Sequence, residues 1–186
     1  MGLMSEALMS DPMTTYDAER AECLVFTYKD GLLSAVAHDL KIRVTELSID
    51  VDWDAPSITA TFDPTSLRVV TPMKDGREAP SLLGDRDKKK IEKNIVDDVL
   101  HAKKHREIRF ASKSVEREGD RARVAGELTL HGTTRELTLE ARKVSETWVA
   151  EARLHKPDFG IEPYTAAFGT LRLKPHVDVT IRLPQG

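Results

Sequence analysis

The chain has 186 residues, of which 40% are hydrophobic and 32% charged, and its net charge at pH 7 is −3. This length is that of one domain with a sizeable core, and the composition argues against a disordered or a membrane-embedded chain. The small net charge and the 5% content of aromatic residues argue against a protein whose main partner is nucleic acid.

The N-terminal segment lacks the basic start and the long apolar core of a secretory signal. No apolar run approaches the ~18 residues that a membrane-spanning helix needs. We therefore expect a flexible extension at residues 1–16, a domain at residues 17–186, and a cytoplasmic location. Cys23, the only cysteine, lies among apolar residues, which predicts a buried structural thiol.

The main signal along the chain is an alternation of apolar and polar residues, which predicts β-strands. The first strand has Leu24, Phe26 and Tyr28 on one face. The phase of the alternation slips by one residue at Glu46, as it does at a bulge or a sharp bend. The apolar positions of the later strands are Leu40, Ile42, Val44, Leu47, Ile49, Val51, Ile58, Ala60, Phe62, Ile108, Phe110, Val124, Leu128, Leu130, Leu137, Leu139, Trp148, Ala150, Ala152, Leu154, Leu171, Leu173, Val177, Val179, Ile181 and Leu183.

Two neighbouring segments depart from this alternation. Residues 85–101 place aliphatic side chains four apart among charged ones, which predicts a helix with Asp85 or Asp87 as its N-cap. Residues 71–84 contain two prolines and two glycines without periodicity, which predicts a long loop. Such a loop and helix would suit a lid on one end of a barrel.

Eight or more strands with one apolar face each, and little helix to cover them, predict an all-β fold. We expect an extended antiparallel barrel of eight strands, or slightly more, with one capping α-helix; a two-sheet sandwich is the alternative. The interior of an eight-stranded barrel is either filled by side chains or holds one small ligand. The alternation alone leaves both outcomes open.

Several motifs in the chain resemble those of the YceI-like family. They lie in the order of that family between residues 20 and 183, at residues 64–67, 108–112, 126–134, 137–140 and 156–161. The resemblance implies a lipocalin-like barrel whose lumen holds a polyisoprenoid, an isoprenoid quinone or a related amphipathic chain, and it implies no catalytic residues. The ligand contacts expected from it are Phe26, His38, Leu40, Ile42, Val44, Phe62, Phe110, Leu128, Leu130, Trp148 and Phe159.

His38 and Asp39 form a polar pair that invites a catalytic interpretation. A triad would need a nucleophile, and although Ser34 is near in sequence, the chain has no G-x-S-x-G elbow. We expect His38 to make a structural hydrogen bond at the end of a turn. The alternative is a contact with a ligand headgroup at the mouth of the barrel.

His101 and His105 are four residues apart, a spacing that could place two metal ligands on one face of a helix. Lys103, Lys104 and Arg106 surround them, and positive neighbours oppose a bound dication. We therefore expect no metal site, and no other feature of the sequence predicts a cofactor.

The sequence thus predicts a binding protein that carries a long apolar molecule and is not an enzyme. The alternative is a solid-cored β-module that acts as a structural or interaction partner without a ligand. An enzyme acting on a lipid is a more distant alternative, in which a His38→Ala variant would bind lipid but lose turnover. The oligomeric state stays open, with a homodimer among the alternatives.

Overall fold

The computed structural model describes residues 13–31, 37–166 and 171–185. Within these residues the chain is mostly β-strand, with a single α-helix, α1 (Asp85–Asn94), that runs on into a π-helical turn, η2 (Ile95–Val99). Two short 3-10 helices are η1 (Pro80–Leu82) and η3 (Lys156–Phe159). The strands are β1 (Met13–Asp17), β2 (Glu22–Lys29), β3 (Asp39–Val44), β4 (Leu47–Asp52), β5 (Ser57–Phe62), β6 (Leu67–Lys74), β7 (Arg77–Glu78), β8 (Ile108–Glu118), β9 (Arg121–Leu130), β10 (Thr133–Val144), β11 (Thr147–His155), β12 (Thr165–Ala166) and β13 (Leu171–Pro184).

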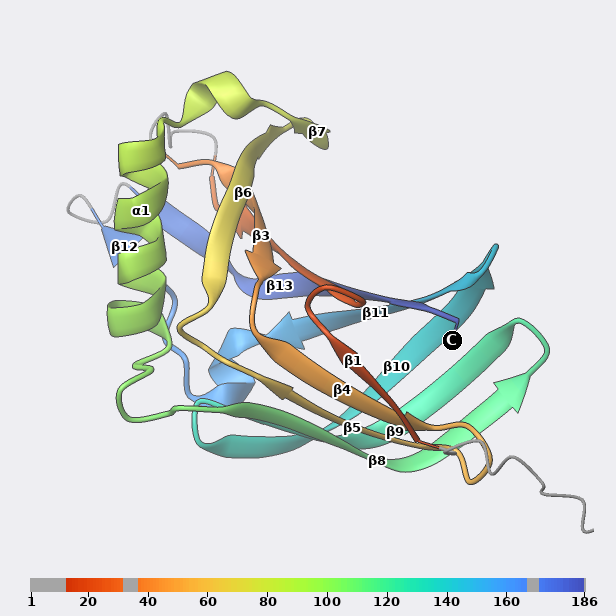
Figure 1. Ribbon diagram of the computed structural model, residues 1–186. Helices are drawn as coiled ribbons and strands as arrows, with labels where there is room; N and C mark the ends of the chain where they lie inside the picture. The colour runs from red at the N-terminus through yellow and green to blue at the C-terminus, as the bar shows by residue number, and fades with distance from the viewer. Residues whose placement is uncertain (1–12, 32–36, 167–170, 186) are drawn as a thin grey trace, which may run out of the picture.

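All of the strand pairs are antiparallel, and the sheet curls around an interior (Figure 1). From β5 the ladder runs through β8, β9, β10, β11 and β13 to β2, and β2 pairs with β3. The chain then passes directly from β3 into β4, and β4 pairs with β5 again. If β1–β2, β3–β4 and β5–β6 are each counted as one bent strand, the described residues form a barrel of eight strands, with β7 and β12 as short additions. The predicted all-β barrel with one helix is confirmed.

The bend between β3 and β4 lies where the alternation slips, at Thr45 and Glu46. Ser66, which is only 1% exposed, holds this bend from the neighbouring bent strand. Its carbonyl oxygen accepts hydrogen bonds from the backbone N–H of Thr45 at 3.0 Å and from the Thr45 hydroxyl at 2.9 Å. Its hydroxyl accepts one from the backbone N–H of Glu46 at 3.1 Å. A buried serine therefore pairs backbone groups that the bend takes out of the ladder.

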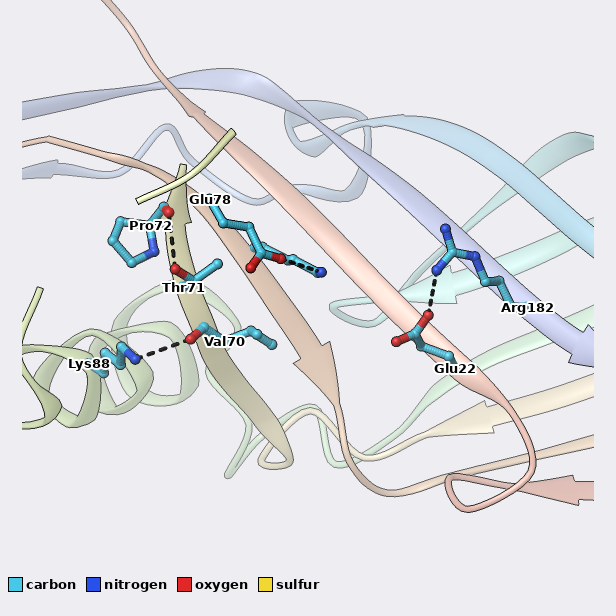
Figure 2. Close-up of polar contacts among 8 residues, drawn as sticks. Glu22, Val70, Thr71, Pro72, Glu78, Lys88 and Arg182 are labelled. Carbon is cyan, nitrogen blue, oxygen red and sulfur yellow. Dashed lines mark hydrogen bonds and ion pairs between the residues drawn. The ribbon is translucent and has the colours of Figure 1, made fainter. Parts of the chain in front are cut away.

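Helix α1 stands beside β6 (Figure 1). Strand β8 pairs with β5 but does not continue along β6, and the helix lies along the edge of β6 that is left without a partner strand. Glu92 of α1 accepts a hydrogen bond from the backbone N–H of Val69 at 2.8 Å. Lys88 donates one to the carbonyl oxygen of Val70 at 3.1 Å, a contact that Figure 2 shows. Because these side chains pair edge groups of β6, the helix forms a part of the barrel wall rather than only a lid.

Polar contacts tie neighbouring strands together on the outside of the barrel. Arg182 of β13 forms an ion pair with Glu22 of β2 at 2.8 Å, and Figure 2 shows the two side chains reaching across the strands. Lys41 of β3 reaches past β6 and forms an ion pair with Glu78 of β7 at 2.8 Å. Pairs of this kind at the surface contribute at most about 1 kcal/mol each, so the apolar interior determines the fold.

Three expectations about element boundaries were wrong. Residues 71–84 are not a long loop, because β6 continues to Lys74, a tight turn follows, and β7 and η1 occupy most of the rest. The N-cap of α1 is Gly84, while Asp85 and Asp87 lie in its first turn. Residues 13–16, assigned to the flexible extension, belong to β1, which pairs with β4 and carries the fully buried Tyr16.

Candidate functional site

The interior of the barrel is a cavity of about 820 Å³, lined mainly by apolar side chains. The strands contribute inward-facing aliphatic residues, and α1 with η2 contributes Ile91, Ile95 and Val99. Inward residues of β13, such as Val179 and Ile181, are only half-buried although they face the interior. Their exposed surface borders the cavity, so the interior is open rather than filled.

Nine of the eleven expected ligand contacts line this cavity. They come from the segment before β3, from β3, β5, β8 and β9, and from β11, and they are His38, Leu40, Ile42, Val44, Phe62, Phe110, Leu128, Leu130 and Trp148. The alternation in these strands therefore places the predicted side chains inside. Their contact with a ligand stays a prediction.

Phe26 lies on the opposite face of β2. The residues of this strand that line the cavity are Cys23, Val25 and Thr27, while Phe26 borders a separate pocket with Tyr28. The face of β2 was predicted wrongly because four apolar residues in a row follow Glu22 at the start of the strand, so that alternation cannot choose between its faces. Burial raises the pKa of the Cys23 thiol to about 12, which keeps it protonated and unreactive.

Phe159 is buried in η3 but is not among the described residues that line the cavity. Its carbonyl oxygen lies 3.3 Å from Nδ1 of His131, in the turn between β9 and β10. Gly160 follows in the left-handed conformation, with a φ of 69°, and ends the short helix. Phe159 therefore belongs to the hydrophobic core and not to the described lining of the cavity.

A few polar groups interrupt the apolar lining. The hydroxyl of Thr27 and the indole N–H of Trp148 are buried, and no described group pairs with them. Lys156, the first residue of η3, is only 7% exposed and also lines the cavity. Burial lowers the pKa of its ammonium group below the ordinary value for lysine. Since the Thr27 and Trp148 groups are fully enclosed, Lys156 is the one of these three where a bound molecule with a polar end would find a partner.

Sequence reasoning missed Lys156 and the residues that α1 contributes. A signal for Lys156 was present, because the inward positions of β11 are Trp148, Ala150, Ala152 and Leu154, and two residues further comes Lys156. The sequence contains no signal that α1 lines the cavity. A helix that caps the end of a barrel and a helix that forms a part of its wall need the same apolar stripe.

The other polar residues considered in the sequence analysis do not form a catalytic or metal-binding arrangement among the described residues. Asp39 accepts a hydrogen bond from the backbone N–H of Lys29 at 2.8 Å, and Ser34 lies outside the described residues. His101 and His105 do not share a helix face, because η2 ends at Val99; instead both rings approach His131, with centroids 5.4 and 4.3 Å away.

No group of three or more His, Cys, Asp or Glu side chains in the described part of the chain could hold a metal ion. Among the helices of residues 13–31, 37–166 and 171–185, none is both long and apolar enough to cross a membrane.

The sequence and the fold were compared with known protein families and solved structures. The model of the YceI-like domain family matches residues 16–184, whereas no curated protein matches the sequence. BcnA from Burkholderia cenocepacia has a similar structure, with a TM-score of 0.63 and 16% identity over 90% of this chain and 97% of that one.

Two further structures share the fold at low sequence identity. A polyisoprenoid binding domain from Saccharophagus degradans, implicated in plant cell wall breakdown, has a TM-score of 0.59 and 12% identity over 92% of this chain and 96% of that one. The YCEI protein of Campylobacter jejuni has a TM-score of 0.55 and 14% identity over 84% of this chain and 91% of that one. Identities this low speak for the fold alone.

Proposed function

Because the chain belongs to the YceI-like domain family, we propose that it binds a long apolar molecule, such as a polyisoprenoid, an isoprenoid quinone or a fatty acyl chain, and carries it in the lumen of its barrel. The observation that supports this proposal is the open cavity of about 820 Å³ with its apolar lining. This volume lies within the range of roughly 300–1,000 Å³ in which small-molecule sites occur. The polyisoprenoid-binding domain of Saccharophagus degradans, which shares the fold, adds to that support.

Apolar burial is the driving force of this binding. The half-buried inward residues of β13 and α1 leave apolar surface uncovered that a ligand chain would cover. Burying ~15 carbon atoms would gain about 12 kcal/mol. Association costs at least about 4 kcal/mol in lost freedom of motion, which leaves an affinity in the micromolar range at best.

The proposal assigns no chemistry to the lumen, so the protein acts as a carrier and not as an enzyme. His38 lines the cavity beside aliphatic neighbours, where it can contact the polar part of a ligand. The rival function, an interaction module without a ligand, would go with a solid core. An open cavity of this size favours the carrier.

The test is mass spectrometry of an organic extract of protein purified without detergent. A stoichiometric isoprenoid or acyl lipid in the extract is the expected result and would identify the ligand. In parallel, a panel of isoprenoids, quinones and fatty acids is screened for a rise in melting temperature, since a ligand that binds only the folded state stabilises it. An empty extract together with no thermal shift across the panel would overturn the proposal.

A further inference from the structure

We propose that the cavity selects a long-chain molecule that ends in an anionic oxygen group, a carboxylate or a phosphate, and that the ammonium group of Lys156 binds this end. This inference rests on the proposed function, because it names the headgroup of the molecule in the lumen. Its evidence is the position of one side chain.

Lys156 faces the inside of the barrel. It is the first residue of η3, directly after the end of β11, is 7% exposed, and lines the same cavity as the aliphatic residues. The other cationic side chains of the lining, Lys90 and Arg117, are exposed to solvent. Lys156 is therefore the buried cation of the described lining.

No described acidic group forms an ion pair with Lys156. Other lysines of the chain have such partners, as Lys41 does with Glu78 and Lys113 with Glu127. A largely buried cation without an ion-pair partner is unfavourable, since burial removes a part of its hydration. The depressed pKa of Lys156, caused by that burial, reflects the same imbalance.

The acidic residues of the lining do not offset this charge. Asp52 is engaged elsewhere, because its carboxylate accepts hydrogen bonds from the backbone N–H groups of Asp54 and Ala55, both at 2.9 Å. Glu151 forms an ion pair with Arg142 at 3.8 Å, and Asp87 lies exposed in the first turn of α1. An anionic headgroup would supply the missing counter-charge at a site of low dielectric, where a charge-assisted hydrogen bond is strong.

The apolar lining of the cavity extends away from Lys156, so it can cover the hydrocarbon tail of a ligand whose headgroup binds there. The inward residues of β11 run from Leu154, two residues before Lys156, to Trp148, which is about 20 Å of strand. One leaflet of a bilayer, filled by ordinary acyl chains, is about 15 Å thick. A headgroup at Lys156 thus leaves room for a tail at least as long as an acyl chain, with the uncovered apolar lining along it.

The test compares pairs of probes that differ only in the headgroup. Oleic acid is titrated against oleyl alcohol, and geranylgeranyl monophosphate against geranylgeraniol, at pH 7.5 with delipidated wild-type protein. We expect the acid or the phosphate to bind at least about tenfold more tightly than its alcohol. The two pairs separate a carboxylate from a phosphate.

Variants then assign the preference to one side chain. Lys156→Met should abolish the preference for the anion while leaving the affinity for the alcohol within threefold, and Lys156→Arg should keep the preference. Lys90→Met removes the same charge from an exposed position of the lining, and it should leave the preference unchanged. Since Lys156→Met also removes an unpaired buried charge, we expect it to raise the melting temperature of the ligand-free protein.

The outcomes are distinguishable. If the alcohols bind and the anions bind no more tightly, or if Lys156→Met keeps the preference, the assignment of the headgroup is overturned while the carrier function stands. If neither alcohols nor anions bind to wild-type protein, both proposals fail. Should Lys156→Met not fold, the wild-type comparison and the Lys156→Arg variant still decide the question.

Discussion

Ala150 offers a direct test of the open lumen, because it is a small residue on the inward face of β11. It lines the cavity between Trp148 and Ala152, and its cross-strand neighbours are Ala141 and Ile181. Ala150→Phe would project an aromatic ring into a cavity of about 820 Å³. The consequences for stability and for binding depend on whether that space is empty in the ligand-free protein.

A filled core and an open lumen predict different changes in the free energy of unfolding of Ala150→Phe. An extra ring in a filled core costs about 1–3 kcal/mol by overpacking. In an open lumen the ring finds new contacts on one side only. We therefore expect the free energy of unfolding to stay the same or to rise by up to about 2 kcal/mol, less than the roughly 3–5 kcal/mol that a fully packed phenylalanine contributes.

Ligand binding should weaken at the same time. The ring takes the place of roughly four methylene groups of the bound chain, worth about 3 kcal/mol at about 0.8 kcal/mol each, so the affinity should fall about a hundredfold. Urea unfolding of the ligand-free protein and titration with oleyl alcohol measure the two effects. The control is Ala111→Phe, at an exposed position of β8 outside the cavity lining.

Two results would refute this reasoning. A loss of more than 1 kcal/mol in Ala150→Phe, with no such loss in the control, would mean that the interior is packed. An unchanged affinity in Ala150→Phe would mean that the ligand does not occupy the lumen beside β11.

Three further predictions concern stability and ionisation. Gly126→Ala should destabilise the fold by about 2–3 kcal/mol in urea unfolding, because its Cβ would lie 2.3 Å from the carbonyl oxygen of Ala111; a loss below 1 kcal/mol would contradict that clash. Burial lowers the pKa of His131, so the unfolded chain binds its proton more readily and stability should fall as the pH drops below about 6.5. Urea unfolding between pH 7.5 and 5 checks this, with a shallower fall expected in His131→Asn; an equal fall in both would refute it. Burial, aided by the hydrogen bond to Asp178, raises the pKa of Tyr28 to about 12, and ultraviolet titration should show Asp178→Asn lowering that pKa part of the way towards 10.

Most of the barrel could be predicted from the sequence because one face of nearly every strand is polar. In β3 and β9, for example, charged or small polar residues separate Leu40 from Ile42 and Leu128 from Leu130, and those apolar residues all line the cavity. In β2 the polar face is missing at its start, and there the prediction placed Phe26 on the wrong side. Period-two reasoning therefore works where burial is one-sided and fails where the outer face is apolar too.

The end of β6 shows a second limit, that of local turn signals. Pro72 lies inside this strand, opposite Leu40, two residues after a bulge in the ladder with β3. Proline is tolerated at such irregular places, where an N–H is not needed for the ladder. The sequence shows the proline but not which strand pairs with this segment or where the ladder has a bulge. The end of the strand, with Pro72, and the turn at Gly76 are therefore predicted as a loop.

Whether the lumen is open or filled depends on α1, and this is why the alternation could not decide it. Eight strands alone enclose an interior that side chains can fill. Here β6 bends away from β8, and the gap beside it is occupied by a helix whose Glu92 and Lys88 pair with the strand edge. A helix about 10 Å across takes more of the perimeter than a strand spaced at about 4.8 Å, so the wall is longer than eight strands would make it. The apolar stripe of α1 faces the space inside this longer wall, so the helix contributes to the perimeter of the cavity and to its lining.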